Sequence, residues 1–140
     1  MVIDFERGAA AVVAPMGVAG GALGYLERAS DLLRDARGTA PEDAMELIYQ
    51  AALRIAGAVL EQNPGRRRSA DHGAWARVRR HAPGYAGHAD AIGAYSRRRE
   101  RVRLGLDDAP APEEVAELRA LVEDFRNHVE SDLGVLPAAA

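Results

Sequence analysis

Residues 112–133 read PEEVAELRALVEDFRNHVESDL, and this stretch shows the clearest structural pattern in the 140-residue chain. Its apolar residues recur mostly at spacings of three and four, which place them on one face of an α-helix. They are Val115, Leu118, Leu121, Val122, Phe125, Val129 and Leu133. Glu113 and Glu114 lie at the N-terminal end, where the helix dipole favours negative charge, and Gly134 follows as a stop signal. The stretch therefore predicts an amphipathic helix with one buried face.

Four stretches upstream show the same helical periodicity. They are residues 23–37, residues 41–62, residues 71–82 and residues 85–102. The helix-breaking segments between them are Gly38, Asn63-Pro64-Gly65 and Pro83-Gly84. Thr39-Ala40-Pro41-Glu42 matches a capping box at the start of the second stretch. The alternating pattern of a β-strand does not occur in the sequence, so we predict an all-α protein.

Short connections favour antiparallel neighbours, so we expect an antiparallel four- to five-helix bundle. We place this bundle at residues 22–134, after a flexible Ala/Gly-rich N-terminal arm at residues 1–21 and before a C-terminal tail at residues 135–140. The arm does not resemble a signal peptide, because Asp4-Phe5-Glu6-Arg7 is acidic where a basic start is required. We therefore expect a cytoplasmic protein that does not enter a membrane.

The composition excludes several kinds of chemistry. The chain has no Cys, which excludes disulfides, thiolate metal sites and cysteine nucleophiles. All 18 basic residues are Arg, so a lysine Schiff base and a P-loop lysine are excluded too. The same bias points to a high-GC bacterial genome, because Arg codons are GC-rich and Lys codons are AT-rich. No nucleotide-cofactor motif is present, and we expect no cofactor.

Charge is divided along the chain, although the overall formal charge is only -3. Residues 1–65 hold 5 Arg and 9 acidic residues, a net charge of -4, and residues 104–140 hold 2 Arg and 9 acidic residues, a net charge of -7. Residues 66–103 hold 11 Arg and 3 acidic residues, a net charge of +8. This Arg-rich block is the main functional feature of the sequence.

Three interpretations of the Arg-rich block are open. It can bind the phosphates of RNA, DNA or a nucleotide, because Arg offers bidentate geometry to phosphate; Trp75, Tyr85 and Tyr95 would then stack on bases if they are exposed. It can bind an acidic partner protein or a second copy of the chain. It can also be paired internally with carboxylates of the last helix, namely Glu117, Glu123, Asp124 or Glu130. The candidate phosphate-binding residues are Arg66, Arg67, Arg68, Arg77, Arg80, Arg97, Arg98 and Arg101.

The four histidines are His72, His81, His88 and His128. A histidine-based metal site needs three or four convergent ligands. His81 and His88 are separated by Pro83-Gly84 and need not share a face. His128 lies at the edge of the apolar stripe, where we expect a half-buried ring bonded to a carbonyl or carboxylate. We therefore predict no metal site.

The order of these elements resembles the HEPN superfamily (higher eukaryote and prokaryote nucleotide-binding domains), in particular its small stand-alone actinobacterial branch. The resemblance rests on the Arg-rich loop, Trp75-Ala76-Arg77-Val78 on a short helix, Pro83, and a long helix that ends in an Arg run before the terminal helix. It covers about residues 22–134 and implies a helical bundle that forms a homodimer. Many members are metal-independent endoribonucleases, in which an Arg binds phosphate and a His moves a proton for the 2′-hydroxyl.

The signature of those ribonucleases is an Arg, four to six residues and a His, near the last long helix. Arg126 and His128 have one residue between them, and Arg67 and His72 have four but follow the second helix. Neither candidate catalytic pair has both the spacing and the place of the signature. We therefore predict a non-catalytic HEPN-like domain that binds nucleic acid, a nucleotide or an acidic partner. The alternatives are a HEPN endoribonuclease and a purely structural dimerisation protein.

Overall fold

The computed structural model describes residues 20–63 and 73–135. Its elements, in chain order, are α1 (Gly20–Asp35), α2 (Pro41–Gln62), α3 (Ala74–His81), the 3-10 turn η2 (Pro83–Tyr85), α4 (Ala86–Gly93), α5 (Ser96–Arg103) and α6 (Pro112–Leu133). None of the described residues lies in a strand, which confirms the prediction of an all-α fold. The predicted arm lies outside the described residues, apart from its last two positions, which belong to α1.

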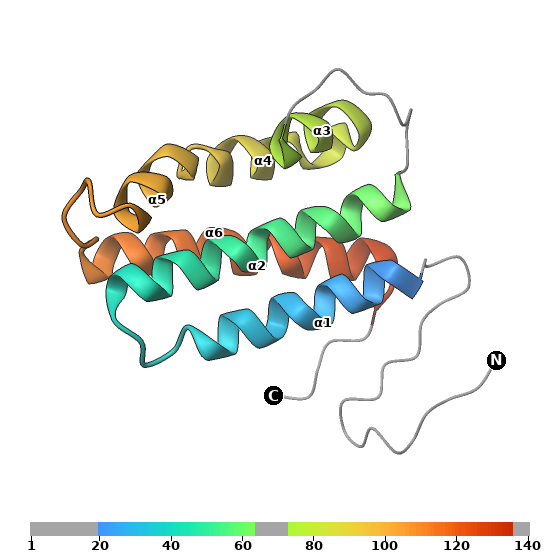
Figure 1. Cartoon of the computed structure of the whole chain (residues 1–140). Helices are drawn as coiled ribbons and strands as arrows, with labels where there is room; N and C mark the ends of the chain where they lie inside the picture. Colours follow the sequence, from blue (N-terminus) through green and yellow to red (C-terminus); the bar gives the residue numbers. More distant parts are fainter. Residues whose placement is uncertain (1–19, 64–72, 136–140) are drawn as a thin grey trace, which may run out of the picture.

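Helix α2 is at the centre of the fold. It packs against α1, α3, α5 and α6, and α6 also packs against α4. Figure 1 shows α1 and α2 running in opposite directions side by side, while α4 and α5 follow one another in a row and α3 lies beside α4. That row takes the place of one long helix in an antiparallel bundle. None of the described helices is long and apolar enough to cross a membrane.

The apolar stripe of α6 forms one wall of the core. Leu118, Val122, Phe125 and Val129 are all at most 1% exposed, which confirms the predicted buried face of this helix. Gly134 ends α6 in the left-handed conformation with φ 71°, and the N–H of the following residue returns to the Glu130 carbonyl at 2.9 Å. The predicted start and stop of the last helix are thus both confirmed.

Helix α2 carries small residues in the core, and one of them, Gly57, lets α1 and α2 approach each other closely. Four alanines of α2, namely Ala51, Ala52, Ala56 and Ala58, are fully buried. A Cβ atom placed on Gly57 would lie 2.9 Å from ring atoms of Tyr25 on α1, well inside van der Waals contact. Glycine at this position therefore lets the Tyr25 ring lie flat across α2.

The prediction of one fourth helix over residues 85–102 is wrong. The chain turns at Ala94 and Tyr95, where the Tyr95 N–H bonds the Ile92 carbonyl at 3.0 Å, a three-residue spacing tighter than that of an α-helix. This turn separates α4 from α5. The Tyr95 hydroxyl donates to Glu117 of α6, so a contact with another helix accompanies the break in a locally helical sequence.

The predicted capping box at Thr39 is also wrong. Ala40 is the N-cap residue of α2 and makes no side-chain capping bond. The Thr39 hydroxyl instead donates to the Ala36 carbonyl at 2.8 Å, closing the end of α1. Gly38, with φ +80°, supplies the left-handed turn between the two helices, as the sequence predicts. The Thr39 side chain therefore satisfies a carbonyl group at the end of α1 and not an N–H group at the start of α2.

We predict opposite effects for two glycine-to-alanine changes. Gly57→Ala should lower the free energy of unfolding by about 1 kcal/mol or more, because the new methyl overlaps the Tyr25 ring. Gly24→Ala on α1 meets open space and should raise it by about 0.5–1 kcal/mol through helix propensity. Urea unfolding followed by circular dichroism measures both. Equal effects of the two substitutions would contradict the close packing of α1 on α2.

Candidate functional site

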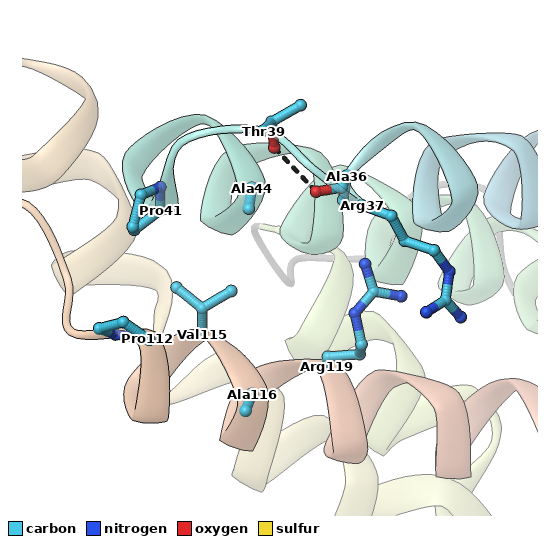
Figure 2. A pocket seen from close by; sticks show the side chains of 9 residues that line it. All are labelled: Ala36, Arg37, Thr39, Pro41, Ala44, Pro112, Val115, Ala116 and Arg119. Atoms are coloured by element: carbon cyan, nitrogen blue, oxygen red, sulfur yellow. Dashed lines mark hydrogen bonds between the residues drawn. The ribbon is translucent and has the colours of Figure 1, made fainter.

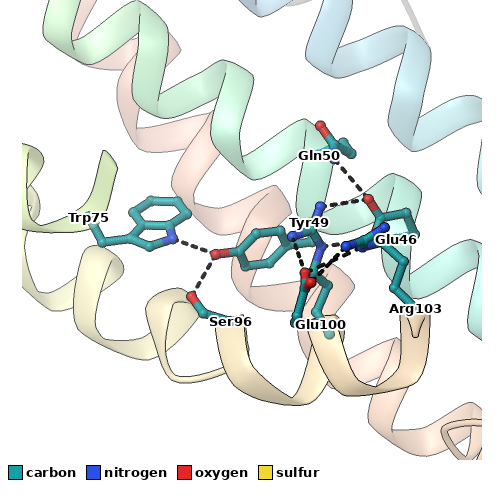
Figure 3. Close-up of polar contacts among 8 residues, drawn as sticks. Glu46, Tyr49, Gln50, Trp75, Ser96, Glu100 and Arg103 are labelled. Atoms are coloured by element: carbon teal, nitrogen blue, oxygen red, sulfur yellow. Dashed lines mark hydrogen bonds and ion pairs between the residues drawn. The ribbon is translucent and has the colours of Figure 1, made fainter. Parts of the chain in front are cut away.

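A chain of polar contacts joins α2, α3 and α5 through the hydroxyl of Tyr49. This oxygen accepts a hydrogen bond from Trp75 Nε1 at 2.9 Å and lies 2.6 Å from Ser96 Oγ, with the three side chains coming from three different helices (Figure 3). Trp75 is only 8% exposed. Its indole is therefore part of the core, which corrects the interpretation of Trp75 as a surface for base stacking.

Arg99 of α5 crosses the same tyrosine and pairs with Glu46 of α2. Its Nε and Nη2 atoms donate to the two carboxylate oxygens of Glu46, both at 2.7 Å, and its guanidinium carbon lies 4.9 Å from the centre of the Tyr49 ring. Burial by itself raises the pKa of Glu46, but the hydrogen bonds from Arg99 and Gln50 outweigh it and hold this pKa below its usual value. Arg99 is thus a structural side chain in this fold.

Arg98 and Arg101 of α5 are also paired with carboxylates of the same chain. Arg98 donates to both oxygens of Glu114 on α6, at 2.9 and 3.0 Å, and to Asp107 at 3.3 Å. Arg101 donates to Asp107 at 2.9 Å. The Arg101 hydrogen bond, with that of Arg98, lowers the pKa of Asp107 against a smaller opposing effect of desolvation. These contacts join the end of α5 to the segment that leads into α6.

Internal pairing therefore neutralises much of the Arg-rich block, since Arg103 is also bonded to Glu100, at 2.6 Å. The partners of the α5 arginines are Glu46, Glu100, Asp107 and Glu114. They differ from the four partners that the sequence suggests, because α5 faces α2 and the start of α6 rather than the middle of α6. No residue of α5 is fully buried, so these polar contacts hold the helix in place together with the partly buried Val102, which packs against the core.

The arginines of α3 are arranged differently. Arg77, Arg79 and Arg80 are exposed, and Arg79 contacts Asp90 of α4 at 3.3 Å. The side chain of Arg77 makes no ion pair or hydrogen bond within the described residues, and the same holds for the side chain of Arg97, which is exposed at the start of α5. Arg66, Arg67, Arg68 and His72 lie outside the described residues. Exposed and unpaired positive charge in the described part of the block is thus shown at Arg77 on α3 and at Arg97 at the start of α5.

The candidate catalytic pair on α6 is not brought together. Arg126 reaches toward α1, with Nη1 3.4 Å from Ser30 Oγ and Nη2 3.0 Å from Glu123, while its buried Nε has no partner within the described part of the chain. His128 lies on another side of the helix, where Nδ1 donates to the Asp124 carbonyl at 2.9 Å. Residues two apart on an α-helix point in nearly opposite directions. The carbonyl bond of His128 is as expected, but the ring is 57% exposed rather than half-buried.

A group that sequence reasoning missed lies between α4 and α6. His88 of α4 places Nε2 3.0 Å from Asp124 Oδ2, and His128 Nδ1 lies 3.5 Å from Asp124 Oδ1. The rings of the two histidines are 5.0 Å apart. The i, i+4 spacing of Asp124 and His128 is the one signal in the sequence that points to this cluster. The third member of the cluster, His88, lies 36 residues before Asp124 in the sequence.

A hollow of about 280 Å³ lies between the α1–α2 turn and the start of α6 (Figure 2). Its walls are mostly alanine, proline and valine, with Arg37 and Arg119 on one side. Glu123 lies 3.8 Å from Arg37 and 3.3 Å from Arg119, and it also pairs with Arg126 at 3.0 Å. The two arginines that line this hollow are therefore already paired with Glu123.

A second hollow, of about 370 Å³, lies along the basic surface of α3. It is lined by Gly73, Trp75, Ala76, Arg79, Ala89, Asp90, Gly93 and Ser96. Its floor is therefore formed where α3 meets α4 and the beginning of α5. The Arg79–Asp90 ion pair at its edge has both side chains about half exposed, at 46% and 65%.

The helix order, the buried tryptophan of α3 and the terminal amphipathic helix are those of a HEPN superfamily domain. Comparison with known families agrees: the model of the HEPN_SAV_6107-like HEPN family matches residues 35–130. The chain belongs to this family, and the match extends from the end of α1 to near the end of α6. Neither a curated protein nor a solved structure gives a significant match to the chain.

We predict that Glu46→Gln destabilises the protein in a pH-dependent way. At pH 7 the change should lower the free energy of unfolding by roughly 1–3 kcal/mol, because Arg99 loses its charged partner. The folded-state pKa of Glu46 is lowered, so its contribution is present above the ordinary value of 4.5 and is lost as pH falls through the folded-state pKa. The difference from wild type should therefore shrink below about pH 4 in urea titrations.

Glu100→Gln is the matched control for this test. Glu100 also pairs with Arg99, at 3.5 Å, but its side chain is 43% exposed. The control should lose less stability at pH 7 than Glu46→Gln, because solvent screens an exposed pair. Equal losses in the two variants would show that the Glu46–Arg99 pair has no special structural role.

Proposed function

We propose that this HEPN domain is a non-catalytic module that binds single-stranded RNA or another nucleic acid through α3. The observation that carries the proposal is the contrast between the two Arg-rich helices. On α5, Arg98, Arg99, Arg101 and Arg103 are held by carboxylates of the same chain. On α3, three arginines within eight residues are exposed. The binding surface is therefore smaller than the whole Arg-rich block.

Helix α3 is suited to present charge because its apolar side fixes it to the core. Trp75 and Val78 are buried, and the indole is further held by the Tyr49 hydroxyl at 2.9 Å. The other side of the helix carries Arg77 and Arg80, and Arg79 lies at the edge of the buried face, beside Asp90 of α4. A guanidinium fork on a rigid helix loses little freedom when it binds a phosphate. The sequence just before α3 adds Arg66-Arg67-Arg68 to the same end of the block.

A ribonuclease is the alternative for the same fold. The proposal does not assign catalysis, because Arg126 is engaged with Ser30 and Glu123, whereas His128 is engaged with Asp124. A phosphate-binding Arg and a proton-carrying His must both reach one phosphodiester. We limit the proposal to binding because the candidate pair on α6 is not brought together.

RNA binding by this protein should depend strongly on salt concentration. Fluorescence anisotropy with a labelled single-stranded RNA should show affinity that falls steeply with salt, because phosphate contacts release counterions. Arg77→Ala should weaken binding and reduce the magnitude of the slope of log K against log salt by about one phosphate contact, roughly 0.7. Arg97→Ala tests whether the surface extends to α5.

Arg28→Ala on α1 is the matched control, because Arg28 is equally exposed and makes no ion pair within the described residues. It should leave affinity and slope unchanged. Absence of RNA binding at low salt would overturn the proposal. Cleavage of the RNA by wild type that is lost in His128→Ala would instead favour the ribonuclease.

A second candidate function, homodimerisation, is favoured by the turn after α5. Leu104 and Leu106 are 55% and 60% exposed, and they are the large apolar side chains that the described residues leave on the surface. Gly105 lies between them with φ +76°, so the turn is sharply bent. Exposed large apolar side chains that lie together are typical of protein contact surfaces. Such a surface would be compatible with nucleic-acid binding on α3.

We predict that the double substitution Leu104→Ser and Leu106→Ser converts a homodimer to a monomer. Burying two leucines contributes roughly 3–6 kcal/mol to an interface, so their loss should raise the dimer dissociation constant by more than tenfold. Size-exclusion chromatography with light scattering measures the mass. A wild-type chain that is monomeric at high concentration, or a variant that stays dimeric, would contradict this assignment.

A further inference from the structure

We propose that His88, Asp124 and His128 bind a divalent transition-metal ion, with Zn²⁺ as the representative. One ligand-capable atom of each side chain lies within 4.8 Å of those of the other two. That separation lets a single ion contact all three groups after small side-chain rotations, because Zn–N and Zn–O bonds are close to 2.0–2.2 Å long. The site is independent of the basic surface of α3.

The chemistry of the three groups favours such an ion. Two of the three donors are imidazole nitrogens, which are borderline ligands and suit Zn²⁺, Co²⁺ or Ni²⁺, whereas the hard ions Mg²⁺ and Ca²⁺ are bound by oxygen ligands such as the Asp124 carboxylate. The carboxylate of Asp124 is shared by both rings, at 3.0 Å from His88 and 3.5 Å from His128. An ion at this place would replace proton-mediated contacts between groups that already face one another.

All three ligands are positioned by the fold. The ring of His88 stacks on the fully buried Phe125, with centroids 5.2 Å apart and an interplanar angle of 22°. Asp124 and His128 are one helical turn apart on the rigid α6, so their side chains lie on the same face. The neighbouring carboxylate of Asp132 is engaged by the Tyr85 hydroxyl at 2.6 Å. The three ligands therefore come from two helices that already pack together.

The proposed site is open on one side. The Asp124 and His128 side chains are 59% and 57% exposed, whereas His88 is 21% exposed. Three protein ligands leave at least one coordination position for water or for a donor atom of a bound molecule. Such a site exchanges its ion readily and joins α4 to α6 when the ion is bound.

The test uses the untagged full chain, because a histidine tag would itself bind the probe. Isothermal titration with Zn²⁺ should show one ion per chain, and titration with Co²⁺ should give visible absorption bands of a protein-bound ion. Mg²⁺ should not compete. His88→Gln and His128→Gln should each weaken Zn²⁺ binding by about tenfold or more, since even groups outside the coordination sphere are worth that much.

Two further variants make the outcome decisive. Asp124→Asn keeps the shape of the side chain and removes its charge, so it should weaken binding even if a histidine variant unfolds. His81→Gln on α3 removes a histidine outside the cluster and should leave affinity unchanged. Circular dichroism verifies that each variant is folded. The proposal is overturned if Zn²⁺ does not bind at millimolar concentration, or if the cluster variants bind it as tightly as wild type.

Discussion

The hydroxyl of Tyr49 is the contact on which the second layer of the fold depends. It joins α2 to α3 through Trp75 and to α5 through Ser96, and the Tyr49 ring lies under Arg99. Helix α3 has only two buried side chains and α5 has none. Neither helix is therefore held by a large apolar face. Hydrogen bonds are directional, so the two bonds of the buried Tyr49 hydroxyl fix the positions of α3 and α5, which hydrophobic packing alone would leave less well defined.

This constraint explains why the arginines of α5 and those of α3 are arranged differently. Because guanidinium groups pair bidentately with carboxylates, α5 is fixed in place by Glu46 on one side and Glu114 on the other. Helix α3 is fixed by apolar contacts and a neutral indole, so its arginines remain exposed. Helix α5 therefore has most of its arginines paired within the chain, whereas α3 keeps its arginines exposed, with Arg79 also paired to Asp90.

The helices and their buried faces could be predicted from the sequence, because a stripe such as that of α6 is a local property of spacing. The break at Ala94 could not, since it accompanies the contact of Tyr95 with Glu117 of another helix. The partners of Arg98 and Arg99 depend on where α5 packs in the fold, and a local sequence pattern does not predict that position. The same holds for His88, which meets Asp124 only because α4 packs on α6.

Glu123 has a consequence for how the first and last helices stay together. Three guanidinium groups, from Arg37, Arg119 and Arg126, converge on this one carboxylate, and two of them also reach the backbone or side chain of α1, at Leu33 and Ser30. The repulsion among the three guanidinium groups is offset by the negative charge of Glu123. Tolerance to mutation is therefore unequal here: the loss of one arginine leaves two others paired with Glu123, whereas the loss of Glu123 removes the carboxylate that pairs with all three.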